Sequence, residues 1–110
     1  MEMYYLKKYK KVKGFVMNRY TGHTSYAYRQ NNDIITSIGF THNKKDKSHK
    51  VKLKHNINPN DNKDCYAKTK VEIQRYNTYR SKPEYSNYRI HKDDRNLIYK
   101  IANSNKKRRY

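Results

Sequence analysis

The stretch IITSIGFTH at residues 34–42 decides the fold, because it is the clearest β-strand in the chain. Side chains alternate between the two faces of a strand. Two sets are therefore expected, the first apolar and the second small or polar: Ile34, Ile38 and Phe40, and then Ser37, Gly39 and Thr41. The apolar set predicts that one face of this strand contacts the core.

Shorter strands are predicted on both sides of this stretch, where β-branched and aromatic residues alternate with polar ones. The predicted strands are residues 14–17, 24–30, 34–42, 50–54 and 65–74. Asn, Asp and Pro, which favour turns, cluster between them at 31–33 and 55–62. Five short strands joined by such turns favour an antiparallel arrangement.

A helix is predicted near the C-terminal end, over residues 92–103. Leu97, Ile98 and Ile101 form one apolar stripe, and Asp93 and Asp94 occupy the first turn, where the helix dipole favours negative charge. The fold expected is mainly β (α+β): a small SH3-like antiparallel barrel or curled sheet of about five strands with a C-terminal helix. Residues 1–13 are expected to form a basic arm, 14–105 one domain and 106–110 a basic tail.

The charge of the chain points to a polyanionic partner. Of its 110 residues, 27 are Lys or Arg and 9 are Asp or Glu, a formal net charge of +18. Residues 14–105 alone hold 18 basic and 8 acidic residues, so the predicted domain is itself basic. We therefore expect the protein to bind RNA or another nucleic acid.

Other partners and sites are disfavoured. The one cysteine, Cys65, forms no internal disulfide, and no apolar run approaches the ~20 residues that cross a bilayer, so a cytoplasmic protein without membrane contact is expected. The nine acids are scattered, whereas a Mg²⁺ or Ca²⁺ site needs several converging carboxylates. No metal and no other cofactor is predicted.

The order of elements resembles that of the PemK/MazF superfamily of small-barrel toxins, including endoribonucleases of RNA-antitoxin systems. The matching stretches are residues 34–42, the strand Val51-Lys52-Leu53, and Cys65-Tyr66-Ala67 leading into Val71-Glu72-Ile73. The resemblance implies RNA cleavage, an antitoxin of protein or RNA as partner, and a homodimer. It assigns an active-site role by position only to Thr41, since Arg19 and Arg29 lack the proline that accompanies the arginine of that family.

Metal-independent RNA cleavage needs a base, an acid and a cation near the phosphate. Histidine and arginine suit these roles near neutral pH. The candidate catalytic residues are Thr41, His42, His23, and Arg19 or Arg29. His49 and His55 are a second candidate pair, and the competing interpretation is that all five histidines are ordinary surface residues.

Two patterns predict contacts with nucleic acid. Lys50, Lys52 and Lys54 would project about 6.6 Å apart from one strand face and follow a phosphate backbone. Tyrosines interleaved with basic residues would stack on unpaired bases, although several must also build a core that has 13 Tyr and no Trp. The remaining candidates are Tyr66, Lys68, Lys70, Arg75, Tyr76, Tyr79, Arg80, Tyr85, Tyr88 and Arg89.

Three hypotheses follow from these patterns. The leading one is an RNA-binding small barrel that acts as a toxin-type, metal-independent endoribonuclease. The second is a non-enzymatic phage or plasmid protein that binds nucleic acid as an inhibitor (anti-CRISPR-like) or as a regulator. The third is a basic ribosome-associated protein. The sequence leaves open whether the protein cuts what it binds.

Overall fold

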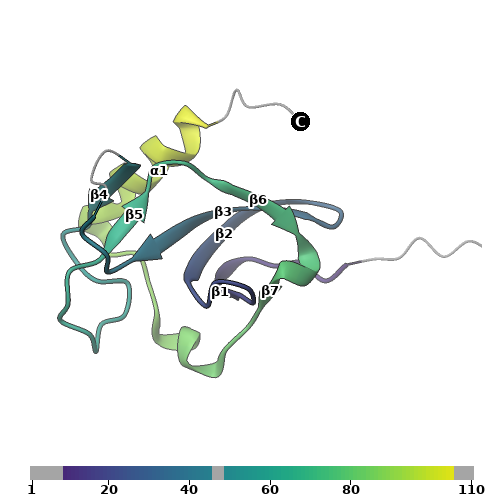
Figure 1. Ribbon diagram of the computed structural model, residues 1–110, viewed down its shortest axis with the longest axis horizontal. Coiled ribbons are helices and arrows are strands. Elements are labelled where there is room, and N and C mark those ends of the chain that lie inside the picture. The colour runs from purple at the N-terminus through teal and green to yellow at the C-terminus, as the bar shows by residue number, and fades with distance from the viewer. Residues whose placement is uncertain (1–8, 46–48, 106–110) are drawn as a thin grey trace, which may run out of the picture.

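Strand β3 lies at the centre of a curled antiparallel sheet, and one α-helix follows the sheet near the C-terminal end of the chain (Figure 1). The computed structural model describes residues 9–45 and 49–105. The elements are β1 (Gly14–Asn18), β2 (Thr24–Asn31), β3 (Ile34–Thr41), β4 (Lys50–Lys52), β5 (Tyr66–Lys68), β6 (Glu72–Arg75), the 3₁₀ turn η2 (Tyr76–Thr78), β7 (Tyr79–Arg80), the 3₁₀ segments η3 (Pro83–Asn87) and η4 (Lys92–Asp94), and α1 (Arg95–Ser104).

Strand β3 is long enough to pair with three other strands. Along one edge it pairs with β2, and a tight turn at Asn32 joins the two strands. Asn32 has a positive φ of 54°, which asparagine tolerates better than most residues. Along its other edge, residues 34–37 pair with β6 and residues 40–41 pair with β5. The sheet order is β4-β5-β3-β2-β1-β7, with β6 as a branch on β3.

The prediction of a mainly β fold with a C-terminal helix is confirmed, and three details differ. Over the described residues, the sheet has seven strands rather than about five, and it is not closed, so the SH3-like barrel is not confirmed. The strand predicted at 65–74 is two strands, β5 and β6, because the chain turns between them, where the amide of Thr69 donates to the carbonyl of His49. The two-residue strand β7 falls in a segment predicted as a connection.

Burial on both faces of β3 differs from the prediction of a single core face. Every residue from Ile35 to Phe40 is buried. Ile38 and Phe40 belong to a core cluster that includes Ile98 and Ile101 of α1, whereas Ile35 belongs to a second cluster with Val16, Ala27 and Tyr79. The reason is that the strongly curled sheet brings β7 back over the face that was predicted to be exposed.

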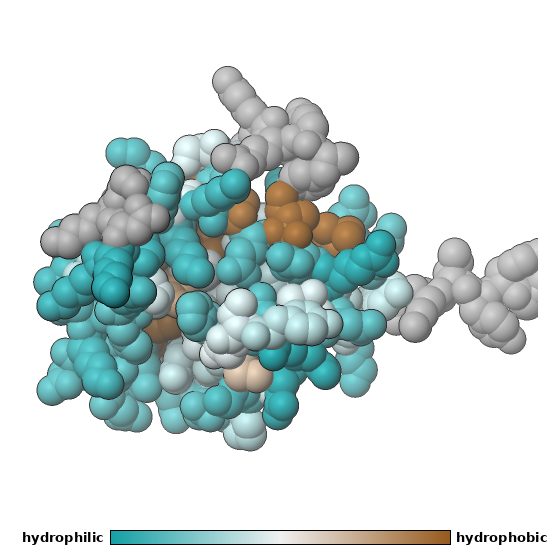
Figure 2. All heavy atoms as spheres, viewed as in Figure 1, coloured by the Kyte–Doolittle hydropathy of each residue, from teal (hydrophilic) through white to brown (hydrophobic). Residues whose placement is uncertain are grey.

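The ends of the chain fall largely outside the described residues. This applies to the predicted tail at 106–110 and to residues 1–8 of the predicted arm. The described part of the arm lies against β2, where the amide of Val12 donates to Oε1 of Gln30 at 2.7 Å. It forms no strand. Figure 2 shows that the viewed face of the molecule is mainly hydrophilic, with apolar atoms confined to small separate patches.

The helix is attached to the loop after β4 through a buried carboxylate. Asp94, only 2% exposed, accepts hydrogen bonds from the backbone amides of Lys54 and His55 at 2.8 and 3.0 Å. The amide of Arg89 donates to the carbonyl of Ile57 nearby. The sequence prediction placed Asp94 at the start of the helix as a charge for the dipole, and the structure gives it this additional contact.

Replacing Asp94 with Ala should lower the free energy of unfolding by about 2–3 kcal/mol, because two amides lose a charged acceptor in a buried position. Urea denaturation followed by circular dichroism measures the change. Ser104→Ala, at the exposed end of the same helix, is the control and should change stability by less than about 1 kcal/mol. Equal effects of the two substitutions would contradict this role of Asp94.

Candidate nucleic-acid interface

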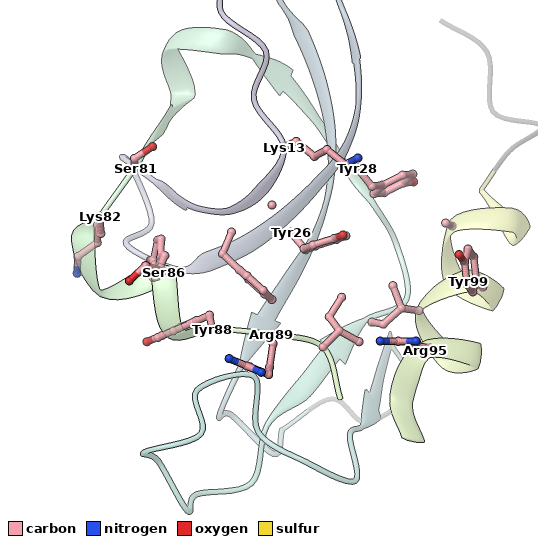
Figure 3. Close-up of a pocket in the computed structure, with 16 residues that line it drawn as sticks. Lys13, Tyr26, Tyr28, Ser81, Lys82, Ser86, Tyr88, Arg89, Arg95 and Tyr99 are labelled. Atoms are coloured by element: carbon pink, nitrogen blue, oxygen red, sulfur yellow. The ribbon is translucent and has the colours of Figure 1, made fainter. Parts of the chain in front are cut away.

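A groove of about 840 Å³ lies between α1, the β1–β2 hairpin and the η3 segment. Figure 3 shows Arg95 and Tyr99 on the helix side, with Arg95 extending towards Arg89. Lys82 and Ser86 lie on the opposite side with their polar atoms turned outwards, and Tyr26 lies between the two sides. The groove is lined by six aromatic and four basic residues: Phe15, Tyr26, Tyr28, Tyr85, Tyr88 and Tyr99, and Lys13, Lys82, Arg89 and Arg95. No acidic residue of the described ranges 9–45 and 49–105 is among its lining residues.

The rings at the base of the groove pack on one another. The Phe15 ring lies 5.1 Å from that of Tyr26 and 5.7 Å from that of Tyr88, and the Tyr85 and Tyr88 rings are 4.8 Å apart. Tyr85 is buried, and its hydroxyl is within hydrogen-bond distance of the Thr24 hydroxyl at 3.1 Å. These contacts make the base of the groove a continuation of the core, held in a fixed position.

Other side chains in the groove reach solvent. Tyr99 is 67% exposed, and Arg95, four residues before it, lies on the same side of the helix. The ammonium group of Lys82 lies 5.9 Å from the centre of the Tyr85 ring, within range of a cation–π contact. Partial burial, and secondarily the charge of Glu84, raise the pKa of Tyr88, which therefore keeps its hydroxyl proton at neutral pH.

The sequence identified only part of this groove. Tyr85, Tyr88 and Arg89 were predicted to contact nucleic acid, and they line it. The prediction missed Lys13, Tyr26, Tyr28, Lys82, Arg95 and Tyr99. The spacing of Arg95 and Tyr99 was a usable signal, since residues four apart share a helix face.

The predicted residues of β6, η2 and β7 lie in a different part of the molecule. Arg75 is paired with Asp33 at 3.7 Å, and the Tyr76 ring lies 5.1 Å from that of Tyr9. Arg80 is exposed on β7. None of these three lines the groove, so they would contact nucleic acid only on a separate surface.

Tyr79 was predicted as a surface contact, but it is 5% exposed and packs in the second core cluster. Its hydroxyl lies 2.8 Å from Oγ of Ser37 and donates towards Glu72 at 3.4 Å. Burial raises the pKa of Tyr79 to about 12, and the hydrogen bond to Ser37 opposes that rise. Its neutral hydroxyl is therefore part of the core.

The predicted lysine stripe is partly occupied by contacts within the protein. Nζ of Lys50 donates to the carbonyls of Asn43 and Lys45, and Lys52 pairs with Asp64 at 3.5 Å. Lys54 is exposed beyond the end of β4. On β5, Tyr66 is buried and Lys68 is half-buried, while Lys70 after the strand is exposed.

Three of the predicted catalytic residues lie together. His23, Thr41 and His42 line a second cavity of about 370 Å³, with Asn56, Asn58 and Asp61 from the loop after β4. The two predicted arginines are elsewhere: Nε of Arg19 donates to the carbonyl of Tyr79 at 3.5 Å, and Arg29 is paired in register with Thr36 on β3. The second cavity therefore has two imidazoles but neither arginine.

His42 is held in this cavity from both sides of its ring. Nδ1 lies 2.9 Å from the carbonyl oxygen of Asp64, and Nε2 lies 3.4 Å from the Asp61 carboxylate. A hydrogen bond from the Nδ1–H group to the Asp64 carbonyl orients the imidazole, and Nε2 then faces the Asp61 carboxylate. Cys65 also lines the cavity, but burial raises the pKa of its thiol to about 11, which leaves it protonated and a poor nucleophile.

The two cavities adjoin, because Tyr88 lines both of them.

Among the described residues, no helix is long and apolar enough to cross a membrane. No family model, curated protein or solved structure matches the chain. The resemblance to the PemK/MazF superfamily stays a prediction from the sequence pattern.

Replacing Tyr79 with Phe should leave RNA affinity unchanged and lower the free energy of unfolding by about 1 kcal/mol, because Ser37 loses a buried partner. Titration of a labelled RNA and urea denaturation measure the two quantities. Tyr20→Phe is the matched control, since Tyr20 is 83% exposed and its hydroxyl should not matter for stability. A loss of RNA affinity in the Tyr79 variant alone would restore its predicted binding role.

Proposed function

We propose that the protein binds single-stranded RNA in the groove between α1 and the η3 segment. The observation that carries the proposal is the composition of the groove lining, which includes six aromatic rings and four cationic side chains but no acidic residue of the described chain. Lys82 at the rim is paired with Glu84 at 3.4 Å, so Lys13, Arg89 and Arg95 supply most of the positive charge. The groove therefore presents aromatic surface and positive charge together.

Unpaired nucleotides suit such a lining better than a duplex does. Their bases are free to stack on exposed rings such as that of Tyr99, while the phosphates lie near Arg89 and Arg95. In a duplex the base faces are already stacked and cannot reach the tyrosines. The hydroxyls of the tyrosines and of Ser81 and Ser86 offer donors and acceptors to the ribose 2′-hydroxyl, which favours RNA over DNA.

Replacing Tyr99 with Ala should weaken binding of a fluorescently labelled, unstructured RNA by about 5- to 100-fold, the cost of losing a stacking partner. Fluorescence anisotropy measures the affinity. Tyr20→Ala is the matched control, because both tyrosines are highly exposed and Tyr20 is not among the residues that line the groove. Equal affinities of the Tyr99 and Tyr20 variants would contradict binding in this groove.

The same titrations at several salt concentrations separate charge from stacking. Arg95→Ala should make the dependence of log affinity on log salt less steep by about 0.7, the value for one lost contact to a single strand, whereas Tyr99→Ala should leave the slope unchanged. Arg80→Ala, an exposed arginine outside the groove, is the control. A DNA of the same sequence tests the preference for RNA.

A second candidate function is RNA cleavage in the adjoining cavity. The observation that favours it is the convergence of His23, Thr41 and His42 there, next to Tyr88, which also lines the groove. In this reaction the 2′-oxygen attacks the neighbouring phosphorus and the bond to the 5′-oxygen breaks. One histidine takes the 2′-hydroxyl proton and the other protonates the leaving 5′-oxygen, which yields a 2′,3′-cyclic phosphate.

Replacing His42 with Ala should abolish cleavage of end-labelled RNA in EDTA while RNA affinity stays within about twofold, because His42 lies outside the groove lining. A denaturing gel and anisotropy measure the two quantities. His49→Ala is the control, since His49 is not among the residues that line either cavity. RNA that remains intact with the unaltered protein would leave a non-enzymatic binding protein, the second of the hypotheses drawn from the sequence.

A further inference from the structure

Two histidines and an aspartate converge where the loop after β4 meets the η4 turn. The ligand atoms of His55, His91 and Asp93 all lie within 4.8 Å of one another. Nε2 of His55 is 2.9 Å from Oδ2 of Asp93, and Nδ1 of His91 is 3.4 Å from the same oxygen. The two imidazole rings stack with their centroids 3.6 Å apart. None of the functions proposed above uses this cluster.

Hydrogen bonds beside the cluster hold its two segments together. The amide of His55 donates a hydrogen bond to the buried carboxylate of Asp94, and the amide of Arg89 donates one to the carbonyl of Ile57. The amide of Asp94 also donates to the carbonyl of His91 at 2.8 Å, so the two segments are held side by side and side-chain torsions are the main adjustment that an ion requires. Preorganisation of this kind lowers the cost of assembling a site from separate segments.

We propose that His55, His91 and Asp93 bind one divalent transition-metal ion, of which Zn²⁺ fits the donors best. Two imidazoles and a carboxylate are the donor types that Zn²⁺ takes in proteins. With metal–ligand bonds near 2.0–2.1 Å, the donor atoms of a tetrahedral site lie about 3.3 Å apart. The carboxylate oxygen already lies at comparable distances from the two imidazole nitrogens, 2.9 and 3.4 Å. Three ligands leave a fourth position for water.

The ion would take the place of contacts that exist without it. It would replace the proton that Nε2 of His55 donates to the Asp93 carboxylate, and it would also displace the hydrogen bond from the amide of Asp93 to Nδ1 of His91 at 3.1 Å. The planes of the two imidazole rings are now inclined by 25° to each other. This angle must increase, because the lone pair of each nitrogen lies in its ring plane and both lone pairs must point at the ion. Together with the charge of nearby Lys54, these costs predict reversible binding rather than a permanently held ion.

The site differs from the hard-cation site that the sequence disfavoured. Mg²⁺ and Ca²⁺ prefer oxygen donors, and this cluster offers one carboxylate and two nitrogens. Selectivity for Zn²⁺, Co²⁺ or Ni²⁺ over Mg²⁺ is therefore expected. The cluster also lies two residues beyond Arg89, so a bound ion would further fix the segment that supplies Tyr88 and Arg89 to the groove.

The proposal is tested by titrating the full-length protein with Co²⁺, whose visible absorption reports ligand number, and with Zn²⁺ by calorimetry. One ion should bind per chain at pH 7.5, and 1 mM Mg²⁺ should not compete. Asp93→Asn and His55→Ala should each weaken binding at least tenfold, with unchanged far-UV circular dichroism. His49→Ala, an exposed histidine outside the cluster, should bind as the unaltered protein does.

Two results would overturn the proposal: no saturable Co²⁺ or Zn²⁺ binding up to 1 mM, or binding that Asp93→Asn and His55→Ala leave intact. The second result would place the ion at other histidines. Because these titrations contain no RNA, their outcome is independent of the function proposed for the groove.

Discussion

The double burial of β3 is the constraint on which the rest of the structure depends. Strands β5 and β6 both pair with the edge of β3 that faces away from β2, and both faces of β3 are covered. The sheet therefore curls, with α1 packed on one face of β3 and β7 on the other. A chain of this size with a net charge of +18 has little apolar material for two core clusters. Tyrosine supplies part of the missing apolar surface, since the rings of Tyr66, Tyr79 and Tyr85 are buried although each carries a polar hydroxyl.

The parts of the fold that depend on local pattern could be predicted from the sequence. Residues 34–41 form a strand and residues 95–104 a helix, close to the predicted ranges. The second core face could not be predicted, because β3 presents Ser37 and Gly39 there, which look like exposed positions. At Gly39, a Cβ would lie 3.1 Å from Oε2 of Glu72, so a larger residue would require the Glu72 side chain to shift. Burial of small polar residues leaves no apolar signal to read.

The site was harder to predict than the fold, since its residues come from distant parts of the chain. Lys13, Tyr26, Lys82 and Tyr99 meet only because β1, β2, η3 and α1 surround one groove. Local runs of Tyr and Arg indicate Tyr88 and Arg89, but they indicate Tyr79 equally, and Tyr79 is a core residue. Composition indicated that basic and aromatic residues would matter, and only the fold separates those that hold the core from those that face a ligand.

The outermost strands of the open sheet, β4 and β7, have three and two residues and carry Lys50, Lys52 and Arg80. An unpaired strand edge invites pairing with another molecule, and short, positively charged edges resist it. Two copies that approached edge to edge would bring like charges together before any backbone hydrogen bond formed. The shortness of β4 and β7 and the basic side chains that they carry are thus features that oppose edge-to-edge association, and they do so without any ligand.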